Sequence, residues 1–332
     1  MAFKLMPNFM SGCLEVDPLV SVIVPVYNGE SYIVEAMESI YAQTYSRLEV
    51  IVVNDGSTDG SEEKLRPYRD RIRYIYKANG GIASAYNLGA QACTGDFVCF
   101  LEQDDMWLPT KVESQVKYLL EKPMMGMVFC RYFTMNEKDP AVQHQLSYLW
   151  PDEVSFEDLF IMTLERSSII TFSSVLMRKK SLGSLMPFDE QLRVSVDYDA
   201  WLRLSYKGKL GFMSVPLLKY RLHDSNTSSV PIYALQDDVI VLQKWAGQSD
   251  VRNAIGKEKV AGRLWRVWDA LRFCHVQLGD VSAERRCLMA MIRLRPLSAD
   301  SMLQLLLSFF SRNMRQALGW YFTKLERFVS RH

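Results

Sequence analysis

Short apolar runs alternate with segments of helical spacing through the first hundred residues. Residues 20–25 and 48–53 are rich in β-branched side chains and end in polar or turn-forming residues, as buried strands do. Residues 31–44 between them repeat apolar side chains at helical spacing, from Ile33 to Tyr41. A strand, a helix and a strand in about 35 residues predict the βαβ unit of a parallel sheet.

The same unit continues to residue 101. We expect a helix at 62–68, a strand at 72–76, a helix at 82–93 and a strand at 97–101. Ligands of open α/β sheets bind outside the carboxyl ends of the strands. The polar segments 25–28, 54–57 and 102–105 should therefore line one crevice.

The second part of the chain has a mixed pattern and then becomes helical. We expect a helix at 111–121, strands at 127–134 and 173–178, a helix at 197–207 and a strand at 212–220. From 233 to 330 the pattern predicts consecutive amphipathic helices, including a hairpin of 264–278 and 283–294 that resembles one tetratricopeptide unit. A generic helical extension explains that hairpin equally well. The predicted organisation is an N-terminal extension (1–19), an α/β domain (20–230, with halves 20–108 and 109–230) and a helical C-terminal extension (231–332).

Charge is balanced overall but uneven along the chain. The 332 residues are 48% hydrophobic with a net charge of +1, which favours a globular protein and gives no indication of a nucleic-acid partner. Residues 251–332 carry 15 Lys and Arg against 6 Asp and Glu, a net +9, and the rest of the chain is −8. The basic part suggests a polyanionic partner or peripheral contact with an anionic membrane surface. The alternative is that these side chains decorate exposed helix faces.

The cysteines and the hydropathy indicate a cytoplasmic location. The six cysteines show no CxxC spacing, and several stand in apolar runs, so we expect reduced thiols. The N-terminus lacks the apolar core of a signal peptide, and no window reaches the roughly 18 apolar residues of a spanning helix. We expect a cytoplasmic protein that touches the inner face of the membrane at most peripherally.

Two polar segments carry the candidate chemistry. Residues 54–59, Asn-Asp-Gly-Ser-Thr-Asp, form either a plain turn with a helix cap or a site where Asp55 accepts from the N–H of a uracil or guanine edge. Residues 102–105, Glu-Gln-Asp-Asp, place three acids after a buried strand. A helix start at Leu108-Pro109 would need only one acid. Three acids indicate Mg²⁺ or Mn²⁺, which take one or two carboxylates and complete their shell with phosphates and water.

These motifs together resemble the inverting family 2 glycosyltransferases of the GT-A fold. The resemblance covers about residues 20 to 225. It is carried in order by VSVIVPVYN, LEVIVVNDGSTD, NGGIASAYNLGAQACTGDFVCFLEQDDMWLP, MPFDEQLRVSVDYDAWLRL and YRLH. It implies an α/β Rossmann-like domain with a mostly parallel central sheet, a nucleotide-binding half at 20–108 and an acceptor half at 109–230. No phosphate-binding P-loop or GxGxxG motif favours a kinase or a dehydrogenase.

The resemblance also implies roles for individual residues. Asp197 matches the general base, which takes the proton of the acceptor hydroxyl in a single displacement. Asp104 and Asp105 match the metal position, and His223 is a candidate on the metal or diphosphate side. The implied nucleotide-binding residues are Pro25, Tyr27, Asn28, Asp55, Gly81, Asn87, Glu102 and Asp104.

Three residues depart from the family pattern. Glu102 stands where Asp is usual, Tyr86 replaces a frequent Arg, and Val196 replaces the acid before the base. The Gln-x-x-Arg-Trp segment of processive polymerases is absent, which suggests transfer of single sugars. The expected donor is a nucleotide diphosphate sugar, most naturally a UDP-sugar, and the expected acceptor is a saccharide or a lipid-linked saccharide.

Other interpretations remain open from the sequence. Asp199 is the rival of Asp197 for the base, although it can also pair with Arg203 at i+4. A nucleotidyltransferase would need a basic Gly-rich loop after the first strand, where Val26-Tyr27-Asn28-Gly29-Glu30 has one Gly and no base. A decayed sugar-nucleotide-binding scaffold that acts through its helical extension would bind or hydrolyse no donor.

Overall fold

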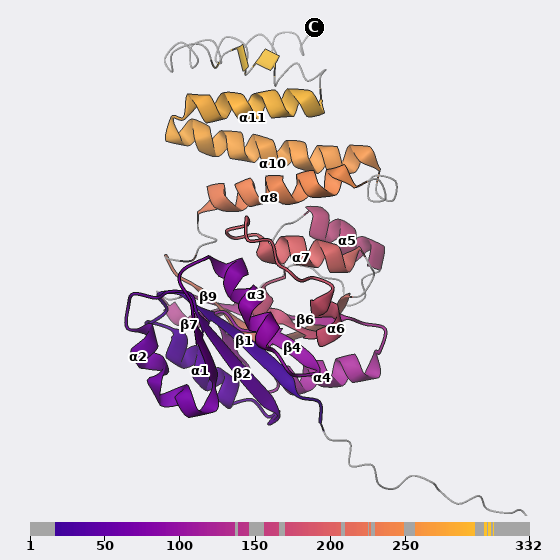
Figure 1. Cartoon of the computed structure of the whole chain (residues 1–332). Helices are drawn as coiled ribbons and strands as arrows, with labels where there is room; N and C mark the ends of the chain where they lie inside the picture. Colours follow the sequence, from indigo (N-terminus) through magenta and orange to yellow (C-terminus); the bar gives the residue numbers. More distant parts are fainter. Residues whose placement is uncertain are drawn as a thin grey trace, which may run out of the picture.

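The protein is built around one mixed nine-stranded sheet (Figure 1). The computed structural model describes residues 17–136, 139–145, 156–165, 170–206, 210–224, 226, 230–248 and 256–295, together with 302, 303, 305, 306 and 308. The strand order is β3-β2-β1-β4-β8-β6-β9-β5, and β7 pairs with β6. The predicted GT-A-like α/β architecture with helices after it is confirmed.

The N-terminal half of the sheet is parallel, as the βαβ pattern predicts. Val20 pairs with Leu48 and with Phe97, so β1 lies between β2 and β4. Alternate residues of β1 face opposite layers, with Val22 and Val24 in one hydrophobic core and Ile23 in the other. The strands of this half are β1 (Val20–Val26), β2 (Leu48–Asn54), β3 (Arg73–Tyr76) and β4 (Phe97–Phe100).

The second half of the sheet is mixed. β8 is antiparallel to both β4 and β6, and β9 runs parallel to β6 over most of its length. The strands of this half are β5 (Met106–Trp107), β6 (Met127–Asn136), β7 (Asp139–Gln145), β8 (Val175–Arg178) and β9 (Leu210–Leu222).

Helices cover both faces of the sheet. The core on one face takes side chains from α1, α2 and α4, and the core on the other takes them from α3 and α5–α7. Both sets bury large apolar residues against the strands, which is the ordinary way a sheet is shielded from water. The bounds are α1 (Ile33–Tyr41), α2 (Ser61–Leu65), α3 (Ile82–Ala92), α4 (Lys111–Glu121), α5 (Phe156–Glu165), α6 (Lys179–Gly183) and α7 (Val196–Ser205).

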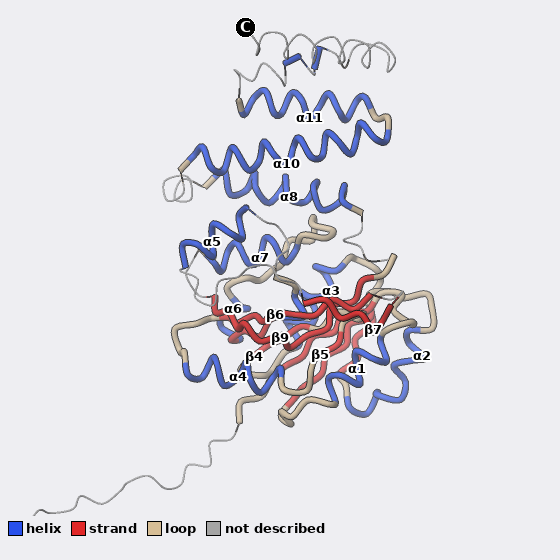
Figure 2. Tube along the Cα trace, turned by 180° about the vertical axis from the view of Figure 1, so that it is seen from behind, coloured by secondary structure: helices blue, strands red, loops and turns tan. Residues whose placement is uncertain are grey.

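In the described part of the chain, three further helices stack in layers beyond α5 and α7 (Figures 1 and 2). They are α8 (Pro231–Gly247), α10 (Lys257–Leu278) and α11 (Val281–Leu294). Val241 and Trp245 of α8 and Leu264 of α10 belong to the same buried cluster as the residues of α7, so the core continues from the sheet into the stack without a break.

The predicted helical hairpin is present as α10 and α11. Gly279 adopts a left-handed conformation with φ of 73°, which ends α10 in the way glycine favours. Asp280 then caps α11, because its carboxylate accepts from the N–H of Ala283 at 2.9 Å. Among the helices that the structure describes, none combines the length and the apolarity needed to cross a bilayer. The five described cysteines carry free thiols.

Some predicted elements differ in detail. The helix predicted at 111–121 is α4, and the alternative of a helix start at Leu108-Pro109 is not realised, because Met106–Trp107 forms the short strand β5 against β9. Residues 172–174 are a 3₁₀ turn rather than the start of the strand at 173–178. The helix predicted at 62–68 is the shorter α2 followed by a 3₁₀ helix, Arg66–Arg71. β7 and α5 were not predicted.

Candidate active site

The loops after β1, β2 and β4 are joined at the carboxyl edge of the sheet. The amide of Gln103 bonds to both main-chain groups of Tyr27: its oxygen accepts from the N–H at 2.9 Å and its nitrogen donates to the C=O at 3.0 Å. The side-chain oxygen of Asn28 accepts from the N–H of Thr58 at 2.8 Å. The main-chain N–H of Asn28 donates to the hydroxyl of Ser57 at 3.0 Å. The three predicted segments therefore do meet in one region.

The sheet opens between β1 and β4 at this edge. Hydrogen bonding between the two strands ends where the N–H of Leu101 donates to the C=O of Ile23 at 3.0 Å. Pro25 lies two residues further along β1, where its missing N–H costs no bond to β4. Tyr27, which follows, is 48% exposed. This opening is the position where open α/β sheets bind their ligands.

Asp55 is buried, and both of its carboxylate oxygens accept hydrogen bonds from the segment before α3. One carboxylate oxygen accepts from the N–H of Gly80 at 2.9 Å and from Lys77 at 2.5 Å. The other oxygen accepts from the N–H of Gly81 at 2.9 Å, and Gly81 has a φ of +86° just before α3. In this structure Asp55 therefore fixes the loop that leads into α3. Its contact with a nucleobase stays a prediction.

A cavity of about 260 Å³ lies beside this region. Three acids from two segments line it: Glu102 and Asp104 of the loop after β4, and Asp197 of α7. Among the residues that line the cavity, Arg193 is the only Lys or Arg. The other lining residues are Ile82, Tyr86, Tyr132, Thr171, Phe172, Val194, Val196, Tyr220 and Asn226. The cavity therefore carries an excess of negative charge.

Glu102 responds strongly to this environment. Its carboxylate accepts from the hydroxyl of Thr171 at 3.1 Å and from that of Tyr86 at 3.4 Å. Burial, followed by the charges of Asp104 and Asp197, raises the pKa of Glu102 to about 8. Positive charge brought into the cavity would favour the ionised form of Glu102 and lower its pKa.

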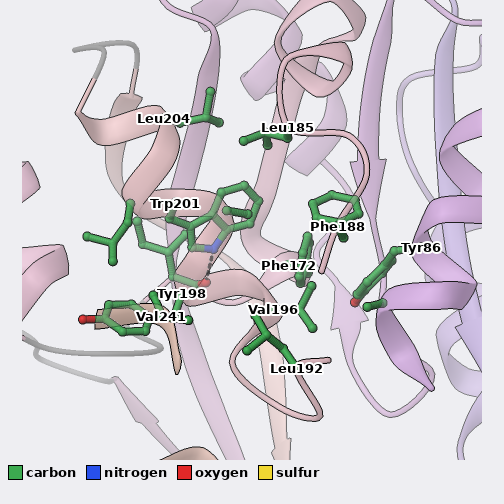
Figure 3. Close-up of a cluster of buried hydrophobic side chains, with 14 of the residues drawn as sticks. Tyr86, Phe172, Leu185, Phe188, Leu192, Val196, Tyr198, Trp201, Leu204 and Val241 are labelled. Atoms are coloured by element: carbon green, nitrogen blue, oxygen red, sulfur yellow. Dashed lines mark hydrogen bonds between the residues drawn. The ribbon is translucent and has the colours of Figure 1, made fainter. Parts of the chain in front are cut away.

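Tyr86 forms the inner wall of the same cavity. Its ring is fully buried among Phe100, Phe172 and Phe188, with the ring centroids of Tyr86 and Phe172 4.2 Å apart (Figure 3). Burial, followed by the charge of Glu102, raises the pKa of Tyr86 well above its usual range. Two of the three departures from the family pattern, Tyr86 and Glu102, thus contact each other.

Asp104 and His223 form a pair at the other side of the cavity. Nε2 of His223 lies 3.0 Å from Oδ2 of Asp104, and the side-chain amide of Asn226 donates to the same oxygen at 3.2 Å. The His223 ring packs on Tyr32 with 4.7 Å between the centroids. The structure therefore brings together two of the predicted metal residues.

Asp105, the third predicted metal residue, is 1% exposed and is not among the residues that line the cavity. One of its oxygens accepts from the N–H of Arg221 at 3.1 Å. The guanidinium of Arg221 donates to the C=O of Asp104 at 2.9 Å and pairs with Glu35. In this structure Asp105 and Arg221 hold the end of β9 against the acidic loop, and a metal contact of Asp105 stays a prediction.

Asp197 and its rival Asp199 face different ways. Asp197, in the first turn of α7, lines the cavity with Glu102 and Asp104. Asp199 pairs with Arg203 at 2.8 Å and lines a separate depression of about 490 Å³ beside α8. Of the two acids, Asp197 is placed to reach a ligand in the acidic cavity.

Asn87 is placed to support the structure rather than to meet a ligand in the cavity. Its amide accepts from the N–H of Phe188 at 2.7 Å and donates to the C=O of the same residue at 3.0 Å. It also donates to Glu190 at 2.9 Å. A contact with the donor stays a prediction for Asn87.

Asp104 of the cavity and its partner His223 fit a divalent cation that takes its other ligands from a substrate. Asp104 and His223 supply one carboxylate and one imidazole at hydrogen-bond distance from each other. Within the described part of the chain, no three His, Cys, Asp or Glu side chains are grouped to hold a metal by themselves. Mg²⁺ and Mn²⁺ commonly take their remaining ligands from phosphates and water, so two protein ligands suffice.

The sequence predicted no individual role for four contributors, Gln103, Thr171, Arg193 and Asn226, although Gln103 lies in the segment 102–105 that was expected to line the crevice. Gln103 stands within the acidic motif, but its bonds to Tyr27 cross 76 positions of the chain. Thr171 lies in a segment with no recognised motif, and Arg193 lies within the motif of residues 186–204 without a predicted role, so the fold shows that both reach the cavity.

Comparison with known proteins agrees with this geometry. Residues 21–185 match the family model "Glycosyl transferase family 2". An uncharacterized glycosyltransferase of Rickettsia typhi is 37% identical over 229 residues, which are 67% of this chain and 69% of the relative.

Two solved structures share the fold at low sequence identity. The crystal structure of S. aureus TarS in complex with UDP-GlcNAc superposes with a TM-score of 0.66 at 19% identity, covering 88% of this chain and 89% of that one. The mannosyltransferase PcManGT from Pyrobaculum calidifontis, in complex with GDP-Man and Mn²⁺, gives a TM-score of 0.56 at 19% identity, covering 91% and 87%. From the family model and the Rickettsia relative, the chain belongs to glycosyl transferase family 2, an inverting family of enzymes that use nucleotide-sugar donors.

Proposed function

We propose that this enzyme transfers a single sugar from a UDP-sugar to a hydroxyl of a saccharide or lipid-linked acceptor, with inversion and with the help of a divalent cation. The observation that carries the proposal is the meeting of Glu102, Asp104 and Asp197 in one cavity at the carboxyl edge of the sheet. The TarS complex with UDP-GlcNAc supports the choice of uridine.

Asp197 is the proposed general base. Its carboxylate removes the proton of the acceptor hydroxyl while that oxygen forms a bond to the anomeric carbon. The bond from this carbon to the diphosphate oxygen breaks in the same step, and its electron pair leaves with the nucleoside diphosphate. A positioned carboxylate base contributes typically about 10²- to 10⁴-fold to the rate.

Asp104 and His223 are the proposed protein ligands of Mn²⁺ or Mg²⁺. Such a cation supplies charge neutralisation for the leaving diphosphate. Asn226 keeps Asp104 in place through its 3.2 Å bond to the same oxygen. The Mn²⁺ in the PcManGT complex supports a cation in a protein of this fold.

The nucleoside is proposed to lie along the opening between β1 and β4. Pro25, Tyr27 and Asn28 stand at this opening, and Gly81 with Asp55 forms the edge beside it. Glu102 and Asp104 then mark the side where the ribose and the diphosphate enter the acidic cavity.

The acceptor and the location of the enzyme are further parts of the proposal. We infer that the basic C-terminal helices make a peripheral contact at the inner face of a membrane, where a lipid-linked acceptor would be found. Flotation of the protein with anionic and neutral vesicles tests this contact. Equal recovery with both kinds of vesicle would contradict it.

Calorimetric titration with UDP, in the presence and absence of Mn²⁺, tests the donor site. We expect binding that depends on Mn²⁺ and that weakens at least about tenfold in Asp104→Asn, which corresponds to about 1.4 kcal/mol. Glu63→Gln, which removes an exposed carboxylate of α2, is the matched control and should bind like the wild type. No detectable binding of either UDP or GDP would overturn the proposal and favour a decayed scaffold protein without transferase activity.

A further inference from the structure

Two consecutive acids of α8 are buried, although the helix belongs to the C-terminal extension. Asp237 is 3% exposed and Asp238 is 2% exposed. Burying a carboxylate is costly unless hydrogen bonds and charges compensate it. Since Asp237 is the seventh residue of α8, it does not cap its own helix. Its burial therefore needs another explanation.

Asp237 collects three successive main-chain N–H groups from another segment. A single oxygen, Oδ2, accepts from Arg193 at 2.8 Å, from Val194 at 2.7 Å and from Ser195 at 3.0 Å. Successive N–H groups that point to one place form a concave site for an anion. The side chain of α8 fills that site and fixes the conformation of the 193–195 segment.

Neighbouring contacts of the extension hold the same segment. The hydroxyl of Ser195 donates to Asp238 at 3.1 Å, and Asp238 lies 3.5 Å from Arg263 of α10. The guanidinium of Arg193 lies over the ring of Tyr233 of α8, 5.4 Å from its centroid. Both ends of the 193–195 segment are therefore tied to the helical stack.

This segment forms one wall of the acidic cavity. Arg193 and Val194 line the cavity, and Asp197 follows Ser195 by two residues at the start of α7. We infer that Asp237 is a positioning residue, which sets Arg193 and the proposed base Asp197 on the acceptor side of the site. The inference rests on the proposed function, and it makes the helical extension part of the catalytic apparatus.

The donor side should not depend on Asp237. The segments proposed for the nucleoside and the diphosphate follow β1, β2 and β4, and their mutual bonds involve no residue of α8 among the contacts described above. Loss of Asp237 should therefore lower turnover but leave the binding of UDP with Mn²⁺ unchanged. A general loss of folding would lower both.

The experiment compares full-length Asp237→Ala, Asp237→Asn and Lys244→Ala. Lys244 is on the same helix and pairs with Asp189 at a partly exposed position, so it controls for the docking of α8. Three quantities are measured: hydrogen exchange of the main-chain amides at 193–196, the Kd for UDP with Mn²⁺, and UDP release from a UDP-sugar that the wild type turns over. Asn keeps one acceptor oxygen without the charge, so it should be intermediate.

We expect Asp237→Ala to accelerate exchange at 193–196 at least tenfold and to lower kcat by about 10- to 100-fold, because small displacements of reacting groups cost that much. The donor KM and the Kd should stay within about twofold. Unchanged exchange at 193–196, or an equal loss of kcat in Lys244→Ala, would overturn the inference. If the wild type turned over no UDP-sugar, the proposed function would fail, and the exchange data would still decide whether Asp237 holds the segment.

Discussion

Asp55 and the three acids of the cavity lie at the same edge of the sheet, and the protein compensates their negative charges differently. Asp55 receives two main-chain N–H groups and the ammonium of Lys77, all at 2.5 to 2.9 Å. Glu102, Asp104 and Asp197 converge on a cavity whose lining includes Arg193 as its only basic side chain. Asp55 therefore has a cation of its own, whereas the three acids of the cavity face one another with Arg193 as the one Lys or Arg of the lining.

The difference separates structure from chemistry. A buried carboxylate with a full set of donors fixes the backbone that supplies them, as Asp55 fixes Gly80 and Gly81. Acids that repel one another keep a cost in the folded state, and a ligand that brings positive charge removes that cost. The following substitutions test whether this division holds.

The largest effect is expected when the proposed base is removed. Asp197→Asn should lower kcat by about 10²- to 10⁴-fold with little change in UDP affinity, because no base then removes the proton of the acceptor hydroxyl. Asp199→Asn, the matched variant two residues away, should keep kcat within about threefold. Single-turnover release of UDP from a donor that the wild type uses measures both. If Asp199→Asn were inactive and Asp197→Asn active, Asp199 would be the general base instead of Asp197.

The next effect concerns stability rather than turnover. Asp55→Ala removes the acceptor of the N–H groups of Gly80 and Gly81 and the carboxylate partner of Lys77, which keeps only its bond to the C=O of Ala78, and we expect a loss of about 3 kcal/mol in the free energy of unfolding. Glu62→Ala, which breaks the exposed pair with Arg69, should cost less than about 1 kcal/mol. Denaturant titration of both variants checks the contrast. Equal losses would show that Asp55 does not hold the loop.

A smaller effect is a pH dependence from Glu102. The pKa of this carboxyl is raised to about 8 in the folded chain, so the folded state holds the proton more tightly than the unfolded state. Its contribution is therefore fully present at low pH and is lost as the pH rises through about 8. Without divalent cations, Glu102→Gln should unfold with a weaker pH dependence than the wild type. Each unit of the shift corresponds to about 1.4 kcal/mol.

Thermal unfolding at a series of pH values in EDTA measures this difference. Added Mn²⁺ should reduce the loss of wild-type stability at high pH, because a cation favours the ionised carboxylates. Parallel pH profiles of the wild type and Glu102→Gln would contradict the electrostatic account of the cavity.

The smallest effect is expected from Tyr86→Phe. The ring keeps its contacts with Phe100 and Phe172, and only the 3.4 Å bond from its hydroxyl to Glu102 is lost. The free energy of unfolding should change by less than about 1 kcal/mol. Chemical denaturation measures it, with Tyr74→Phe, which removes the hydroxyl bonded to Asn54, as the control. A much larger loss would mean that this hydroxyl organises the cavity.

The parallel half of the fold was predictable because buried parallel strands are continuous apolar runs. β1, β2 and β4 lie within two residues of their predicted bounds for this reason. The mixed half was harder, because a two-residue strand such as Met106–Trp107 exists only through its pairing with β9. No local sequence pattern predicts such a strand.

The candidate site divides in the same way. Asp104, Asp197 and Glu102 stand in recognisable motifs and do meet in the cavity. The main-chain N–H of Arg193 donates to Asp237, 44 positions along the chain, and no spacing in the sequence records that contact. Asn87 stands in a motif but bonds to Phe188 in the fold. Sequence motifs thus indicated the chemistry better than they indicated the support around it.

The continuous core between the sheet and the helical stack has a consequence for folding. Val241 and Trp245 of α8 pack in the same cluster as Trp201 of α7 and Phe172 beside the cavity. Segments that share one core lose their packing together, so they should unfold in a single cooperative transition. A chain that ended at residue 230 would expose the partners of Trp245, which include Phe160 and Tyr206. The helical extension would then act as an obligate part of the folding unit.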